Sequence, residues 1–307
     1  MKTQYKITAL PFHTNRANII AVFFIIWGIT LSTIPNTLVI LTDYFSFFFL
    51  GILGATFANA TGAGGGVVFI PMFNQLGFSE AQAVATSFTI QCFGMSAGAI
   101  AWYSHYQKER KTDSNWQAFW PIITLATIAS ILGLWTTYGL NLNSPASLHE
   151  SFSLFSIFLG VCILASVYLI NAGHVQKKLR PLDIIALAAI SYVGGLITAW
   201  LSVGVGELVA IYLIVRRYEV TLAVATAVVI SAFTVWASTP QHWFIAPEYY
   251  WQVILFAGPG AVIGGFVARK LVAALSARRL KIFFALWILI VGISTSSIPR
   301  YIHTLFQ

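Results

Sequence analysis

The residues of this chain that could do chemistry stand out because their surroundings are so apolar. Of 307 residues, 58% are hydrophobic and only 8% are charged. Against that background the stretch "GAGGG" places glycine at four of the five positions 62 to 66, and Glu207 lies deep inside an apolar run. Backbone N–H groups of a glycine-rich helix break can bind an anion, and a carboxylate removed from water can carry a proton. These two features therefore predict an anion site and a proton-coupling residue.

Polar side chains near the glycines extend this candidate site. Hydroxyl and amide groups can donate to an anion, although Ser and Thr in membrane helices often bond their own backbone or a neighbouring helix instead. The predicted substrate-binding set is Asn59, Thr61, Gly62, Gly64, Gly65, Gly66, Thr86, Ser87, Gln91, Gly204, Gly206 and Thr226, with Ser231 as a further donor. Two alternatives stay open at this point. The glycines could serve tight helix packing, and Glu207 could cap the N-terminus of a restarted helix.

Enzyme chemistry is not expected. The two cysteines, Cys92 and Cys162, fall inside predicted helices, where a small apolar residue is the ordinary interpretation. No His, Asp and Glu cluster of the kind that forms a metal or nucleophile site is visible. The glycine cluster lacks the dinucleotide-binding pattern, and no Walker lysine follows it. We therefore expect no cofactor, no metal and no catalytic residue.

Long apolar runs must position the polar residues. Runs of about 17 to 25 apolar residues can cross a bilayer as helices. Such runs occur at 17–40, 81–104, 116–139, 151–171, 219–238, 250–269 and 281–299. Two further runs, 44–77 and 183–215, are too long for one helix and carry glycines midway. The chain is thus predicted to be an all-α, multi-pass membrane protein.

The positive charges predict how the chain crosses the membrane. All but one of the 17 Lys and Arg residues lie in the N-terminal segment or in four short loops, so their positions indicate membrane topology rather than a nucleic-acid surface. The positive-inside rule then places the N-terminus in the cytoplasm. Segment 44–77 has no Lys or Arg at either end, whereas 183–215 has them at both. Each of these segments is predicted to turn back within the membrane, from opposite faces.

The two turning segments resemble each other. "GAGGG" at 62–66 can be aligned with "GVGEL" at 204–208, which also aligns Thr56 with Thr198, and "AVAT" recurs at 83–86 and 223–226. We infer two inverted repeats, each a broken helical hairpin followed by three transmembrane helices, plus an extra N-terminal transmembrane helix. The expected divisions are 1–43 for the N-terminus and added helix, 44–171 for repeat 1, 172–299 for repeat 2 and 300–307 for a short tail.

These motifs resemble a known family. "GAGGGVVFIP" followed by "AVATS", with a second glycine break and a second "AVAT" in the other half of the chain, is similar to the sulfite exporter TauE/SafE family of bacterial inner-membrane proteins over residues 44–299. Repeat 2 departs from the family pattern: Glu207 and Leu208 replace two glycines, Leu213 replaces the proline and Ala227 replaces the serine. The resemblance implies a transporter of small sulfur-containing or carboxylic anions and leaves the substrate open.

The expected function is therefore a secondary transporter that moves a small anion, such as sulfite or a sulfonate, out of the cell. An anion channel and a proton-coupled importer of a small organic acid are the alternatives. The expected partners are the anionic substrate, the lipid bilayer, protons as coupling ion and a second copy in a homo-oligomer, with no nucleic acid.

Overall fold

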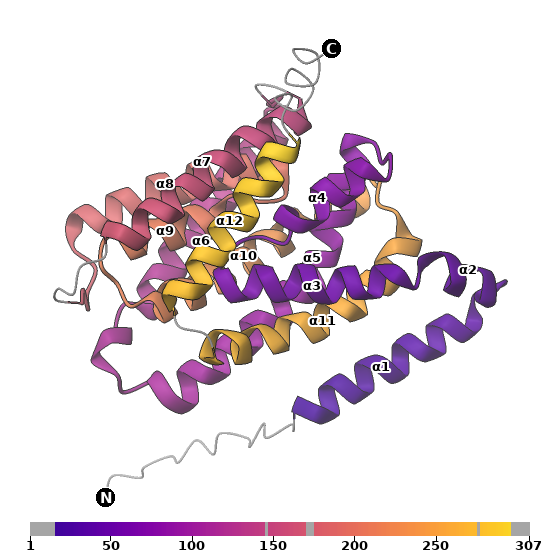
Figure 1. Cartoon of the computed structure of the whole chain (residues 1–307), viewed down its shortest axis with the longest axis horizontal. Helices are drawn as coiled ribbons and strands as arrows, with labels where there is room; N and C mark the ends of the chain where they lie inside the picture. The colour runs from indigo at the N-terminus through magenta and orange to yellow at the C-terminus, as the bar shows by residue number, and fades with distance from the viewer. Residues whose placement is uncertain (1–15, 145–146, 170–174, 275–276, 296–307) are drawn as a thin grey trace, which may run out of the picture. The chain divides into compact units, whose positions relative to one another are not determined.

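The described part of the chain is helical throughout. The computed structural model describes residues 16–144, 147–169, 175–274 and 277–295, and within these ranges it contains no strand (Figure 1). The chain divides into two compact units, residues 1–43 and 44–307. The first unit contains α1 (Arg16–Thr33) and most of α2 (Thr37–Tyr44). Residues 1–15, expected in the cytoplasm, and the expected tail 300–307 lie outside the described residues.

Ten helices of the second unit can be grouped as two successive sets of five. The first set is α3 (Ser46–Thr61), α4 (Gly66–Gln75), α5 (Glu80–His105), α6 (Phe119–Gly139) and α7 (Leu148–Leu169). The second is α8 (Pro181–Leu201), α9 (Val205–Val215), α10 (Val220–Pro240), α11 (Trp251–Ala274) and α12 (Ala277–Thr295). Six of the predicted membrane-crossing runs each correspond to one helix, whereas the run 17–40 is divided between α1 and α2 at residues 34–36. Each of the two longer runs is divided near its glycines.

Helix lengths agree with a multi-pass membrane protein. Six helical segments among the described residues are long and apolar enough to cross a bilayer, or seven if the bent pair Thr37–Tyr44 and Ser46–Thr61 counts as one. One length differs from expectation. With 21 residues α8 is about 31 Å long at 1.5 Å per residue, so it could cross alone, whereas α9 with 11 residues could not.

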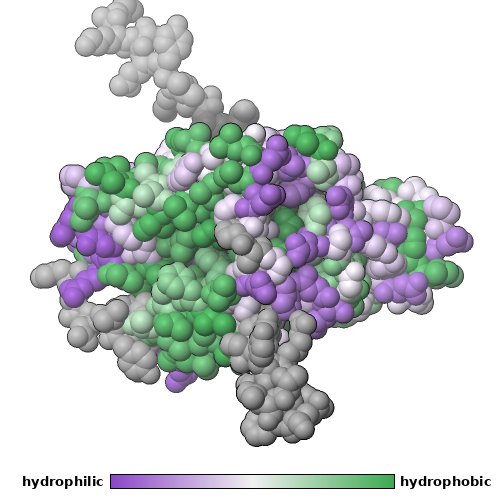
Figure 2. Space-filling model, turned by 90° about the horizontal axis from the view of Figure 1, so that it is seen from above, coloured by the Kyte–Doolittle hydropathy of each residue, from purple (hydrophilic) through white to green (hydrophobic). Residues whose placement is uncertain are grey.

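Apolar side chains on the surface fit the same setting. Leu132, Leu154, Ile185 and Ile290 are each at least 59% exposed, on four different helices of the second unit. Figure 2 shows hydrophobic residues in broad contiguous areas of the face that it draws. Soluble proteins rarely expose such continuous apolar surface, but lipid-facing helices require it.

The packing joins helices from the two sets of five. Helix α3 packs on α11, α8 on α6, α5 on α10, and α7 on α12. The last pair runs side by side in Figure 1. Between these two helices, Ser153 Oγ donates to Gly292 O at 2.7 Å. In every one of these pairs, one helix comes from each set, so neither set is a separate domain.

The basic loops contact one another. Lys177 Nζ donates to Ser114 Oγ at 3.0 Å, and Trp116 Nε1 donates to Glu219 Oε2 at 3.0 Å. The loops without Lys or Arg are linked separately, since Leu148 N–H donates to Glu80 Oε1 at 3.0 Å. The second unit therefore gathers basic loops at one end of its helices and neutral or acidic loops at another.

Helix ends reveal how the two sets correspond, and they correct one alignment. Gly62 and Ser202 both follow a helix in the left-handed conformation, with φ of 83° and 58°. Gly77 and Arg217 do the same after the next helices, with φ of 78° and 66°. The intervals 62–202 and 77–217 are equal, and the interval 83–223 between the two "AVAT" segments is equal to both.

The alignment of "GAGGG" with "GVGEL" uses an interval two residues longer than the one at which these helix ends recur. It pairs position 62 with 204 and Thr56 with Thr198, and at that offset the helix ends do not match. The offset set by the helix ends instead pairs Gly64 with Gly204 and Gly66 with Gly206.

Candidate functional site

The two helix breaks lie directly against each other. The first break connects α3 to α4, and the second connects α8 to α9. A Cβ atom added to Gly66 would lie 2.5 Å from Ser202 O, and one added to Gly206 would lie 2.3 Å from Gly62 O. Only glycine allows backbones to approach this closely. Two segments from different halves of the chain thus form one site from broken backbone.

Glu207 bridges the two breaks. Its Oε1 atom accepts the N–H of Gly64 at 2.6 Å, and its Oε2 atom accepts the N–H of Gly204 at 2.9 Å. The Glu207 residue is only 2% exposed. Within the described residues, the ion pairs involve other acidic groups and none involves Glu207. Backbone N–H groups from the two breaks therefore hold this buried carboxylate.

A second polar network occupies the neighbouring N–H group. Gln91 Oε1 accepts the N–H of Gly65 at 2.7 Å, and Gln91 Nε2 donates to Ser202 Oγ at 2.7 Å and Ser202 O at 3.0 Å. Ser202 Oγ donates in turn to Ser87 Oγ at 2.9 Å. Sequence reasoning missed Ser202. The signal that could have identified it is a polar residue that ends a long apolar run two positions before Gly204.

Four of the predicted binding residues have other partners. Asn59 Nδ2 donates to Ala55 O and Gly94 O, Thr61 Oγ1 to Phe57 O, and Thr226 Oγ1 to Leu222 O, while Thr86 Oγ1 accepts the N–H of Tyr250. These bonds stay within a helix or join neighbouring segments. Thr61 nevertheless lies at the first break, because its Oγ1 atom also accepts the N–H of Ala63 at 3.2 Å. The structure therefore brings together eleven of the fourteen predicted residues: Thr61, Gly62, Gly64, Gly65, Gly66, Ser87, Gln91, Gly204, Gly206, Glu207 and Ser231.

Ser231 adds a polar atom without a partner. Its Oγ atom is buried and has no hydrogen-bond partner in the described residues. A Cβ atom on Gly206 would lie 2.4 Å from this oxygen, so the hydroxyl is directed at the second break. The interval from Gln91 to Ser231 equals that between the two "AVAT" segments, and the two side chains contact the first and the second break respectively. Buried polar atoms are normally hydrogen-bonded, so the missing partner sets the Ser231 hydroxyl apart from the other predicted donors.

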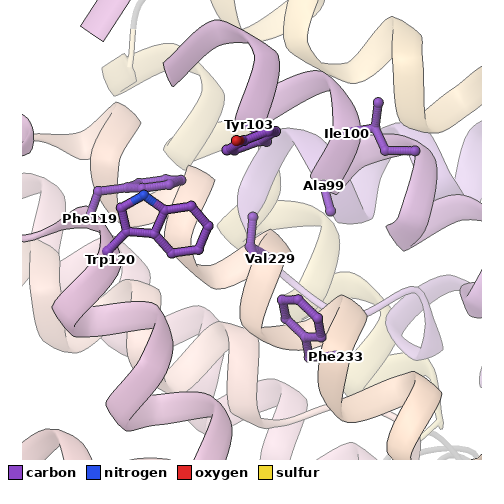
Figure 3. A pocket seen from close by; sticks show the side chains of 7 residues that line it. All are labelled: Ala99, Ile100, Tyr103, Phe119, Trp120, Val229 and Phe233. Atoms are coloured by element: carbon purple, nitrogen blue, oxygen red, sulfur yellow. The ribbon is translucent and has the colours of Figure 1, made fainter. Parts of the chain in front are cut away.

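Two surface grooves are unsuited to an anion. One, of about 240 Å³, lies between α5, α6 and α10 and is lined by Ala99, Ile100, Tyr103, Phe119, Trp120, Val229 and Phe233 (Figure 3). The other, of about 490 Å³, lies between α7, α8 and α9 and includes Phe158, Val193 and Leu208. Apolar and aromatic side chains line both, so hydrocarbon chains fit them better than charged groups do.

The breaks also differ from the sequence expectation in one respect. An open cavity lined by free backbone N–H groups was expected there. Instead, the N–H groups of Gly64 and Gly65 already have side-chain acceptors in Glu207 and Gln91. In this structure a carboxylate oxygen and an amide oxygen of the chain itself therefore accept these N–H groups.

Comparison with known proteins identifies the family. The model of one protein family, described as sulfite exporter TauE/SafE, matches residues 47–295, a range that includes both breaks and reaches all ten helices grouped above. No curated protein and no solved structure matches the chain. The resemblance inferred from "GAGGGVVFIP" and "AVATS" is confirmed, and with it the expectation of a transporter rather than an enzyme. The chain belongs to the TauE/SafE sulfite exporter family and is a multi-pass membrane protein.

Proposed function

We propose that this protein is a secondary transporter that moves a small oxyanion, such as sulfite or a sulfonate, across the bacterial inner membrane and out of the cell. The observation that carries the proposal is the convergence of N–H groups from both helix breaks on one carboxylate, that of Glu207. A site that binds the carboxylate of a side chain offers the same donors to the carboxylate or sulfonate of a substrate.

The helices that follow the breaks support an anionic substrate. Helices α4 and α9 begin at Gly66 and Val205, within the site. Each directs its first N–H groups and the positive end of its dipole toward the break. Discontinuous helices in known transporters present their N-termini to anionic substrates in this way. The substrate is therefore expected to contact Gly64, Gly65 and Gly204 through their backbone.

The arrangement of helices supports two inverted repeats, 44–171 and 172–299. If α3 to α7 correspond to α8 to α12, exchanging the two sets turns the pair α3 and α11 into the pair α8 and α6, and both pairs pack together. The pairs α5 with α10 and α7 with α12 exchange into themselves. This is the pattern expected when two related halves surround a shared site, which can then open alternately to each side.

Glu207 is proposed to couple transport to protons. A fixed carboxylate in the path of an anion repels it, so transport requires that Glu207 be neutralised or moved. Protonation as the anion enters, followed by release on the return step, removes that repulsion. Export itself needs no added driving force, because an anion leaving a negative interior gains about 2.3 kcal/mol per charge per 100 mV.

Flux into and out of liposomes tests this function. Purified protein in liposomes is expected to carry one or more members of a panel of sulfite, sulfonates and short carboxylates, with saturation at high substrate concentration and with a pH-dependent rate. The Glu207→Gln variant is expected to transport with a flat pH profile, since it cannot ionise. The Glu80→Gln variant is a control, because Glu80 bonds Leu148 away from the breaks. Unchanged pH dependence in Glu207→Gln would contradict proton coupling, and absence of flux for every anion would contradict the function.

A further inference from the structure

Glu207 satisfies the chemical requirements of a bound ligand. Its carboxylate presents two oxygens, and each accepts one backbone N–H, at 2.6 Å from Gly64 and 2.9 Å from Gly204. A capping role alone would need only the second bond, which lies within three residues of the same chain segment. The first bond joins Glu207 to the opposite break, 143 residues away. The carboxylate therefore spans the same two donors that a small oxyanion would span.

The donors of this site are of the kind that recognises an oxyanion. Backbone N–H groups at a helix start bind carboxylates, sulfonates and sulfite alike, because each offers two oxygens to neighbouring donors. The unpartnered and buried Ser231 hydroxyl, directed at the same break, shows that the site has a donor that Glu207 leaves unused. An occupant with a third oxygen could use this donor, whereas the Glu207 carboxylate has only two.

We propose that Glu207 is an internal competitor of the transported anion: in the state described here its carboxylate fills the anion site and holds the two breaks together, and the substrate binds by displacing it. This inference rests on the proposed transport function and adds a regulatory step to it. The displaced state is the one in which the breaks can separate, so binding of substrate itself opens the contact between the two halves. Without substrate, the two breaks stay in contact and no ion passes between them.

Competition has a measurable consequence. A ligand that binds only the fraction of molecules in which the site is vacant shows an affinity reduced by that fraction. A tethered carboxylate acts at a high effective concentration, so the vacant fraction is small. Removing the carboxylate is then expected to strengthen anion binding. A purely structural Glu207 predicts the reverse, since losing a cap that joins the breaks would weaken or abolish binding.

Binding to the purified full-length protein in detergent tests the proposal. The probes are sulfite and methanesulfonate, measured by calorimetry with wild-type protein, Glu207→Ala, Glu207→Gln and the control Glu80→Gln. We expect Glu207→Ala to bind at least one probe about tenfold more tightly than wild type or Glu80→Gln, as expected if wild type is vacant about a tenth of the time. Acetate should raise the melting temperature of Glu207→Ala in a concentration-dependent manner, because acetate replaces the missing carboxylate, and should raise that of wild type only at about tenfold higher concentrations.

The possible results distinguish failure of this proposal from failure of the proposed transport function. Equal or weaker binding in Glu207→Ala, with wild-type binding intact, overturns the competitor and leaves the transporter standing. Binding by none of the four proteins overturns both. If Glu207→Ala does not fold, Glu207→Gln decides, because its amide keeps an oxygen for Gly64 N–H but cannot accept from Gly204 with its nitrogen. Weaker binding by Glu207→Gln than by wild type then overturns the competitor.

Discussion

A methyl group is the smallest side chain that would force the two helix breaks apart. On Gly206 its carbon would lie 2.3 Å from Gly62 O and 2.4 Å from Ser231 Oγ, whereas on Gly64 the nearest atoms lie 3.2 Å away or farther. The two positions thus tolerate very different amounts of added volume. Gly206 does not have a positive φ, whereas Gly204 does. Glycine is needed at Gly206 because a side chain there would collide with the backbone of the other break.

We predict a graded series of alanine variants. Gly206→Ala should lower stability by roughly 1–3 kcal/mol through overpacking, and Gly64→Ala should lower it less. Gly139→Ala is the control, because no atom lies within 4 Å of an added Cβ there. Melting temperatures in detergent give the order directly. Equal melting temperatures for Gly206→Ala and Gly139→Ala would show that the two breaks are not in contact.

At the same scale, the sequence identified most of the site residues but not their partners. Glu207, Gln91 and the glycines were recognisable because each is unusual in an apolar run. The bond from Gly64 N–H to Glu207 was not predictable, since it depends on how two segments 143 residues apart meet in space. The role of hydroxyls such as that of Thr226 was ambiguous for a related reason. A serine or threonine hydroxyl in an apolar helix can donate to a backbone carbonyl of the preceding turn, as Thr226 does to Leu222 O.

At the scale of elements, the hairpin of α8 and α9 is closed at both ends. One end is the break itself. At the other, Asp183 Oδ1 accepts from Arg216 Nε at 2.6 Å and from the Tyr212 hydroxyl at 2.8 Å, and Asp183 Oδ2 accepts from the Tyr218 hydroxyl at 3.1 Å. Asp183 is fully buried, and the hydrogen bond to it raises the pKa of Arg216. This ion pair fixes how α9 lies on α8, and hence where Glu207 is held.

We predict that Asp183→Asn destabilises the protein and disturbs the site. Asp183 is buried but Arg216 is 32% exposed, so the larger cost comes from the Tyr212 and Tyr218 hydroxyls, which lose a charged acceptor, and should be about 1–3 kcal/mol. Asp113→Asn is the matched control: Asp113 pairs with Arg110 at 2.8 Å but is 24% exposed, so its loss should cost about 1 kcal/mol or less. Chemical unfolding of both variants measures the difference. A cost for Asp183→Asn no larger than that for Asp113→Asn would contradict the role of this pair in fixing the hairpin.

Element boundaries explain why the sequence alignment of the two halves was two residues out. The glycines shared by "GAGGG" and "GVGEL" favour aligning position 62 with 204, and the match of Thr56 with Thr198 supports the same interval. The chain, however, places a left-handed residue after each helix, and at the second break that residue is Ser202 rather than glycine. Serine in this conformation carries no sequence signal, because left-handed geometry is unusual for it. Helix existence was predictable from apolar runs, but the register between halves was not.

At the scale of the whole molecule, a returning hairpin contributes no net crossing of the membrane, whatever its depth. The greater length of α8 therefore leaves the topology unchanged, provided that α9 brings the chain back to the side on which α8 began. The contact between Asp183 at the start of α8 and Arg216 just after α9 supports this return. The proposed topology then counts seven crossings, of which the first is α1 and the last is α12; the apolar stretches of these two helices are shorter than the six segments counted above.

Seven crossings would place the two ends of the chain on opposite sides of the membrane, and the positive-inside rule predicts that the basic loops face the cytoplasm. Loops 106–118, 175–180 and 216–219 contact one another and carry Lys and Arg, whereas the loop 246–250 carries none. We predict that reporters fused at residue 1 or inserted at 112 are active only as cytoplasmic reporters, and that reporters inserted at 247 or fused at 307 are active only outside. Identical signals from residues 1 and 307 would contradict seven crossings and, with them, the inverted order of the two halves.

The proposed topology depends on the positive charge of the basic loops. Replacing positive by negative residues in one of these loops tests that dependence. Each Lys or Arg near an anionic membrane surface contributes about 1 kcal/mol to retention on that side. Exchanging Lys108 and Lys111 for Glu should therefore weaken the cytoplasmic signal of the reporter at 112. Gln307→Glu is the control, because it leaves the charge of every basic loop unchanged, and it should leave every reporter signal unchanged. A full cytoplasmic signal at 112 in the doubly exchanged variant would show that helix packing, rather than loop charge, sets the orientation.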